Sequence, residues 1–230
     1  MGSWTEMPLA CVDTETTGTD VSTDQIVTAF VGRVDGSVVR RRHWVAQPSI
    51  SIPAEATAIH GVDDEYVRKH GRPHKGVVTE IVNELYACWS EGRVVAVFNG
   101  AFDFSLIATH APGFEIRGPI FDAFVADKHY DRFRKGSRKL SAVMIAYGMR
   151  LDDAHDAEAD AVAAARLAWK LPRVYPELAT YTASELMTHQ ADWYREQAYS
   201  LIDYLRRNDR DFSDVRTAWP VATGTEEQAA

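Results

Sequence analysis

Short apolar runs alternate with turn signals along the first fifty residues and predict strands. The run at residues 9–13 is bounded by a turn at Gly18, which indicates a buried strand. Residues 25–34 and 37–46 are strand-like, and Asp35-Gly36 between them is a strong hairpin signal. The three segments together predict a three-stranded meander.

The rest of the main domain alternates helical spacing with short apolar runs. A helix over residues 75–89 is predicted from apolar residues at helical spacing, namely Val78, Ile81, Val82, Leu85 and Tyr86. Two further buried strands are expected at 94–98 and 119–121. A short helix should open at Asp63-Asp64, and others should cover 102–110, 123–130, 140–147 and 156–170. This alternation predicts an α/β fold.

A long amphipathic helix is predicted near the C-terminus. Thr182 and Glu185 fit a capping box, and a helix of about 25 residues with one apolar stripe should follow. We expect the stripe to pack on its own domain, while a second copy or a polymerase is the alternative partner. The expected domains are therefore residues 1–178, and 179–230 for this helix and a disordered tail after Trp219.

Composition narrows the class of protein. The 230 residues are 46% hydrophobic and 25% charged, enough for one sizeable core. The net charge of −8 argues against binding polyanions over the whole surface. No long uncharged apolar run or secretory signal is present, so no membrane contact and a cytoplasmic location are expected. Cys11 and Cys88 should be reduced and buried.

Acidic residues stand at the ends of two predicted strands. Asp13 and Glu15 should point the same way, because residues i and i+2 of a strand share a face. Hard divalent cations prefer carboxylate oxygens, so a metal half-site is the hypothesis, and a solvated strand end is the alternative. Asp103 follows the strand at 94–98, where it is either a third ligand or an ordinary helix-start aspartate.

The last acidic stretch opens the helix at 156–170. His155 and Asp160 are five residues apart, a spacing that does not place two residues on one helical face. For both to serve one site, His155 must lie on the preceding turn while Asp160 points inward. The alternative is ordinary compensation of the helix dipole.

A basic loop stands out in this acidic chain. Residues 132–139 carry five positive charges interleaved with an aromatic residue: Arg132, Arg134, Lys135, Arg138 and Lys139. Such a loop suits contact with a nucleic-acid backbone, and a solvated, mobile loop would have the same composition.

Four motifs resemble the DEDDh group of 3′-to-5′ exonucleases. This DnaQ-like family includes the proofreading subunit of bacterial replicative polymerases. The motifs are D-T-E-T-T-G at 13–18, I-H-G at 59–61, N-G-A-F-D at 99–103 and H-D-A-E-A-D at 155–160. The resemblance implies an RNase H-like fold with a mixed five-stranded sheet flanked by helices, to which the C-terminal helical extension is added.

The resemblance also implies the catalytic groups. Asp13, Glu15, Asp103 and Asp160 would hold two divalent metal ions, Mg²⁺ or Mn²⁺, that serve phosphodiester hydrolysis. His155 would be the general base, a role that suits the ordinary histidine pKa of about 6.5. A sister group has tyrosine four residues before the last aspartate, where this chain has Asp156.

The terminal nucleotide should be held by residues that the resemblance assigns. These are Thr14, Thr16, Gly18, Ile59, His60, Asn99 and Phe102. Phe98 stands where many family members carry histidine.

The implied function is release of nucleoside monophosphates from the 3′ end of single-stranded DNA, in proofreading or DNA repair. The alternatives are an RNA-trimming 3′-5′ exoribonuclease of the same fold and a non-catalytic nucleic-acid-binding module. The expected partners are 3′ ends of single-stranded DNA or RNA. The sequence does not distinguish between these two substrates.

Overall fold

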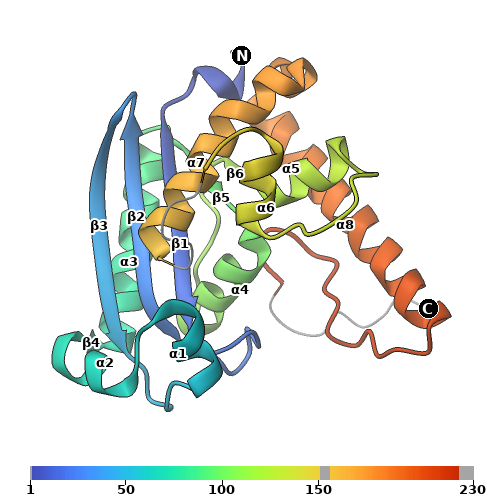
Figure 1. Ribbon diagram of the computed structural model, residues 1–230. Coiled ribbons are helices and arrows are strands. Elements are labelled where there is room, and N and C mark those ends of the chain that lie inside the picture. The colour runs from blue at the N-terminus through green and yellow to red at the C-terminus, as the bar shows by residue number, and fades with distance from the viewer. Residues whose placement is uncertain (1, 151–155, 223–230) are drawn as a thin grey trace.

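A mixed sheet forms the centre of the computed structural model, which describes residues 2–150 and 156–222 (Figure 1). Its strand order is β4-β3-β2-β1-β5-β6. The strands β1 (Leu9–Thr16), β2 (Ile26–Asp35) and β3 (Val38–Gln47) form the expected antiparallel meander. Both β5 (Val94–Val97) and β6 (Ile120–Asp122) run parallel to β1.

The fold class agrees with the expectation, but the sheet has six strands rather than five. The additional strand, β4 (Arg72–Pro73), pairs with the end of β3. Two residues are too few to show the alternation that identifies a strand, so β4 could not be predicted from local patterns.

Two long helices cover the sheet on opposite faces (Figure 1). The helix α3 (His74–Ser90) packs behind β2, β3 and β5, and α7 (Ala157–Val174) crosses in front of β1 and β2. The side of α7 that faces the sheet is rich in buried alanines, including Ala161, Ala164 and Ala168. These small side chains let α7 lie close to the strand that carries Asp13 and Glu15.

Five shorter helices complete the described part of the fold. They are α1 (Ala54–His60), α2 (Asp64–His70), α4 (Gly100–His110), α5 (Ala123–Tyr130) and α6 (Leu140–Ala146). Of these, α2 packs on β3 and α6 packs on α7. Single 3₁₀ turns cover Trp4–Glu6 and Pro176–Thr180. Cys11 and Cys88 are both free thiols in the core, as expected.

The predicted C-terminal helix is α8 (Ala183–Arg207), and its capping box is present. The helix packs on α5 and β6 through a buried amide. Gln190 accepts a hydrogen bond from the backbone N of Asp122 at 2.7 Å and donates one to the carbonyl of Ile120 at 2.8 Å. A side chain thus satisfies backbone groups at the outer edge of β6, and α8 packs on its own domain.

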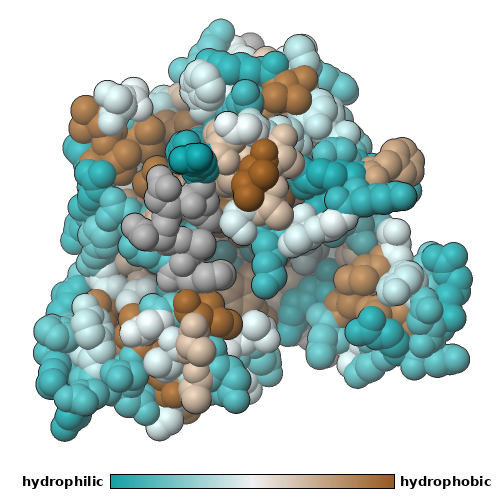
Figure 2. Space-filling model, viewed as in Figure 1, coloured by the Kyte–Doolittle hydropathy of each residue, from teal (hydrophilic) through white to brown (hydrophobic). Residues whose placement is uncertain are grey.

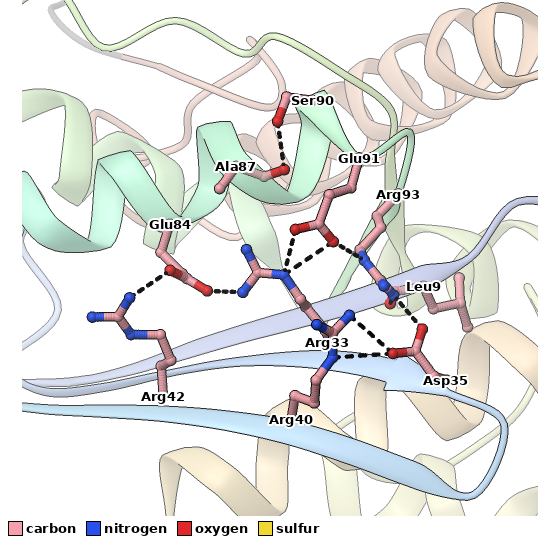
Figure 3. A network of polar contacts seen from close by, with 10 residues as sticks. All are labelled: Leu9, Arg33, Asp35, Arg40, Arg42, Glu84, Ala87, Ser90, Glu91 and Arg93. Carbon is pink, nitrogen blue, oxygen red and sulfur yellow. Dashed lines mark hydrogen bonds and ion pairs between the residues drawn. The ribbon is translucent and has the colours of Figure 1, made fainter.

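A network of ion pairs fastens α3 to the other end of the sheet (Figure 3). Glu84 is buried and accepts hydrogen bonds from Arg33 and Arg42. Arg93, also buried, pairs with Asp35 at 2.9 Å in the β2–β3 hairpin. Because Asp35 lies beside the start of β1, this network is structural and remote from the acidic end of β1.

Within the described part of the chain, no helix is long and apolar enough to cross a membrane.

Candidate active site

Three carboxylates converge where β1 ends and α7 begins. Asp13 and Glu15 share one face of β1, as strand alternation predicts. Asp160 reaches them from the first turn of α7. One oxygen from each of the three side chains lies within 4.8 Å of the others. The structure therefore brings together three of the four acids that the sequence proposes as metal ligands.

Asp160 is positioned by contacts at the start of α7. The side chain of Asp156 caps the helix by accepting a hydrogen bond from the backbone N of Glu158 at 3.1 Å. The Glu158 carboxylate in turn pairs with Arg41 and with His43 of β3, the latter at 3.1 Å. These contacts hold the first turn of α7 over the sheet.

Asp103, the fourth acid, adjoins this group from α4. Its side chain is buried, and its Oδ1 accepts a hydrogen bond from the Thr14 hydroxyl at 2.6 Å. Asn99 caps α4 in the left-handed conformation, with φ 68°, and the helix starts at Gly100. A Cβ at position 100 would meet Cγ1 of Val97 at 2.5 Å, so glycine permits this tight junction.

Burial and mutual repulsion disfavour the charged forms of these acids. Burial, followed by the charge of Asp103, raises the pKa of Asp13 well above its ordinary range. Burial, followed by the charge of Asp160, raises the pKa of Glu15 to about 8. Burial also raises the pKa of Asp103 to about 7.

The donor set fits a divalent metal ion. No lysine or arginine forms an ion pair with Asp13, Glu15 or Asp103 within residues 2–150 and 156–222. Carboxylate oxygens are the ligands that hard cations such as Mg²⁺ prefer. A bound cation would offset the repulsion that raises their pKa values.

Residues proposed to hold the terminal nucleotide surround the acids. Thr14 is buried, and its hydroxyl donates a hydrogen bond to Asp103. The Thr16 hydroxyl donates to the carbonyl of Gly18 at 2.7 Å and shapes the turn after β1. A Cβ at position 18 would lie 2.5 Å from Oδ2 of Asp24, so a larger residue here would displace the Asp24 carboxylate.

The other residues proposed to hold the terminal nucleotide lie at the end of α1 and at the start of α4. Ile59, near the end of α1, is 57% exposed. His60 is half-buried beside the backbone of Thr16, and burial lowers its pKa. Asn99 is exposed, and Phe102 is half-buried in the first turn of α4. His155, the expected general base, lies outside the described residues.

The basic loop divides into two kinds of residue. Arg134 and Arg138 point inward and pair with the fully buried carboxylate of Asp127 at 2.6 and 2.8 Å. The Tyr147 hydroxyl donates to the same carboxylate at 2.9 Å. Arg132, Lys135 and Lys139 remain exposed. Two of the five residues proposed as backbone contacts thus already have a structural partner, which their position in the sequence did not reveal.

Asp122 is a residue that our sequence analysis did not single out. It is fully buried, and its carboxylate accepts hydrogen bonds from the backbone N of Asn99 and of Gly100, both at 2.9 Å. It also caps α5. The only signal was an aspartate between an apolar strand and a helix, which identifies a helix cap but not the link to α4.

Comparison with known proteins then identifies the family. Residues 10–168 match the RNase T family model, which is described as exonuclease. The chain belongs to this exonuclease family. The match includes β1, α4 and the start of α7, which carry the four acids. Enzymes of the family need divalent metals, in agreement with the donor set. No curated protein matches the sequence.

Solved structures of exonuclease I share the fold. Escherichia coli exonuclease I in complex with a dA16 oligonucleotide is 18% identical, with a TM-score of 0.64 over 86% of this chain and 45% of that chain. The moderately thermophilic exonuclease I of Methylocaldum szegediense is 19% identical, with a TM-score of 0.62 over 83% and 45%. The chain thus spans less than half the length of these proteins.

Proposed function

We propose that this chain is a metal-dependent 3′-5′ exonuclease that releases nucleoside monophosphates from single-stranded DNA. The observation that carries the proposal is the convergence of Asp13, Glu15 and Asp160, with Asp103 beside them, in a member of an exonuclease family. Similar exonuclease I structures have been solved with single-stranded oligonucleotides, which supports the choice of substrate.

The four acids would hold two divalent ions, Mg²⁺ or Mn²⁺. Such ions lower the pKa of water and neutralise charge on the phosphodiester during hydrolysis. Thr14 keeps Asp103 oriented toward this site, and the contacts of Glu158 keep Asp160 in place. His155 would take the proton of the attacking water, since its ordinary pKa is close to neutrality.

The terminal nucleotide would bind among the residues that surround the acids. Ile59 and Phe102 offer apolar surface to its base and sugar. His60, Asn99 and the backbone from Thr14 to Gly18 offer polar contacts. Farther along the strand, Arg132, Lys135 and Lys139 would contact phosphates, whereas Arg134 and Arg138 would do so only while also holding Asp127.

The proposed domains are residues 1–178, which hold every catalytic group, and 179–230, which pack on them through α8. A role in proofreading would require a polymerase partner, and a role in DNA repair would not. The second candidate function is RNA trimming, because the same site chemistry hydrolyses either backbone.

Matched single strands of DNA and RNA test the proposal. Each would carry a 5′ label, and products would be resolved at single-nucleotide steps in the presence of Mg²⁺. We expect a ladder that shortens from the 3′ end, with DNA degraded faster. Faster degradation of RNA would favour the second candidate, and binding without cleavage by fully folded protein would favour a non-catalytic module.

A further inference from the structure

The turn that starts α4 is held by one buried carboxylate. Asn99 has a left-handed conformation there, with φ 68°, which is disfavoured for a residue that carries a Cβ unless its surroundings hold it. Asp122 does so by accepting hydrogen bonds from the backbone N of Asn99 on Oδ1 and from that of Gly100 on Oδ2. Asp103 lies in the first turn of α4. The direction of its side chain therefore depends on Asp122.

Asp122 is in turn held by a residue near the end of the chain. Its carboxylate is fully buried, and no lysine or arginine pairs with it among the residues that the structure describes. A buried carboxylate without a cation depends on its hydrogen-bond donors. On Oδ2, the indole of Trp219 donates at 3.2 Å beside the backbone N of Gly100. Without the indole, the carboxylate is held less firmly at the turn.

A second contact joins the same part of the chain to α4. The backbone N of Ala222 donates to the hydroxyl of Ser105 at 2.8 Å, and Ser105 is fully buried. Trp219 and Ala222 belong to the return segment, residues 208–222, which leads from the end of α8 back to α4 (Figure 1). Figure 2 shows a hollow between the body of the molecule and the lobe formed by the end of α8. The two contacts thus lie where the chain rejoins the body.

We propose that the return segment positions Asp103 for metal binding, with Trp219 as a positioning residue that acts through Asp122. The indole orients the carboxylate, and the carboxylate holds the turn that aims α4. The return segment lies outside residues 10–168, which match the family model, so this support comes from a part of the chain that the model does not include. The positioning role rests on the proposed function, because it concerns a ligand of the same metal site.

Two substitutions test the positioning role. Trp219→Phe removes the indole donor and keeps most of the ring. Trp44→Phe is its matched control, because the buried Trp44 indole donates to the carboxylate of Glu80 at 3.0 Å, between β3 and α3. Ser105→Ala removes the acceptor of Ala222 and leaves the indole bond in place. Urea unfolding midpoints would establish that the three variants fold, and Ser105→Ala decides alone if Trp219→Phe does not.

Metal affinity separates positioning from a contribution to stability alone. For Trp219→Phe we expect calorimetry to show Mn²⁺ affinity lowered about 3- to 10-fold, since the loss of one hydrogen bond acts on the ligand indirectly. The Mg²⁺ concentration for half-maximal cleavage should rise by a similar factor. Ser105→Ala should change both quantities in the same direction. Trp44→Phe should lower the unfolding midpoint and keep both quantities at their wild-type values.

Hydrogen exchange reads the turn in metal-free protein. The amides of Asn99 and Gly100 should exchange faster in Trp219→Phe than in the wild type, and at the wild-type rate in Trp44→Phe. Wild-type Mn²⁺ affinity in folded Trp219→Phe, or an equal loss of affinity in Trp44→Phe, would overturn the positioning role. If the wild type cleaved no single strand, the proposed function would fail. Mn²⁺ affinity and amide exchange would then still decide whether Trp219 positions Asp103.

Discussion

The indole nitrogen of Trp219 donates a hydrogen bond to Oδ2 of Asp122 at 3.2 Å, and both side chains are buried. Asp122 also holds the backbone at the start of α4 and caps α5. One carboxylate therefore connects the segment after α8 with the helix that carries Asp103. The residues beyond the family match take part in supporting the acidic site.

Replacing Trp219 with phenylalanine removes this donor and keeps most of the ring. Because Asp122 retains its backbone donors, we expect a loss of about 1 kcal/mol in the free energy of unfolding. Urea unfolding measures the loss. Trp169→Phe, at a side chain that is 56% exposed, is the control and should change little. Equal midpoints for Trp219→Phe and the wild type would show that the bond contributes nothing.

Removing one positive charge from the basic loop should have different effects at Arg134 and at Lys135. Arg134→Met removes a charged hydrogen bond to the buried carboxylate of Asp127 and should lower the free energy of unfolding by about 1.5–3 kcal/mol. Lys135→Met, at an exposed position, should leave stability within about 0.5 kcal/mol. It should instead reduce the salt slope of single-strand binding by about 0.7. Equal stability of the two variants would contradict the structural role of Arg134.

Metal-free protein should lose stability as the pH rises. The folded-state pKa of Glu15 is about 8 and that of Asp103 about 7, against ordinary values of 4.5 and 3.8. An acid with a raised folded pKa binds more protons in the folded state, so stability falls between the ordinary and the folded pKa. With EDTA, the melting temperature should decline from about pH 4 to pH 8, and less steeply in Glu15→Gln.

Addition of Mg²⁺ should reverse that decline near pH 8, because an ion that binds only the folded state stabilises it. A melting temperature that rises with pH in EDTA would mean that the acids are not held together in the folded protein.

His155 tests the general-base assignment. If it takes the proton of the attacking water, His155→Ala should lower turnover by roughly 10²- to 10⁴-fold and remove the acidic limb of the pH–rate profile. Metal binding should be largely retained, as calorimetry with Mn²⁺ can verify. A profile that keeps its acidic limb would exclude the role, and a loss of only a few-fold would indicate a helix-capping or exposed side chain.

Local sequence patterns predicted most of the secondary structure. The alternation in β1 placed Asp13 and Glu15 on one face, and Thr182 with Glu185 marked the start of α8, because both signals lie within a few residues. The start of α4 was expected at residue 102 but lies at Gly100. The cause is the contact of Asp122 with the preceding turn, which is distant in sequence.

Contacts between residues that are distant in sequence also explain which features of the candidate site could not be predicted. The hydroxyl of Thr14 reaches Asp103 across 89 positions of sequence, and Trp219 reaches Asp122 across 97. In the sequence, Asp127 does not differ from an exposed aspartate of a helix. In the folded protein it is buried and pairs with Arg134 and Arg138. Neither amino-acid composition nor hydrophobic periodicity predicts contacts between residues so far apart in the sequence.

The most direct measurement of the central claim compares Asp13→Asn with the wild type for Mn²⁺ binding and for release of nucleotides from 5′-labelled single-stranded DNA. Asparagine keeps the shape of the side chain and removes its charge. We expect cleavage to be abolished and Mn²⁺ affinity to fall, while stability in EDTA stays equal or rises because one repelling charge is gone. Retained cleavage, or loss of cleavage only through unfolding, would contradict a metal site built on these carboxylates.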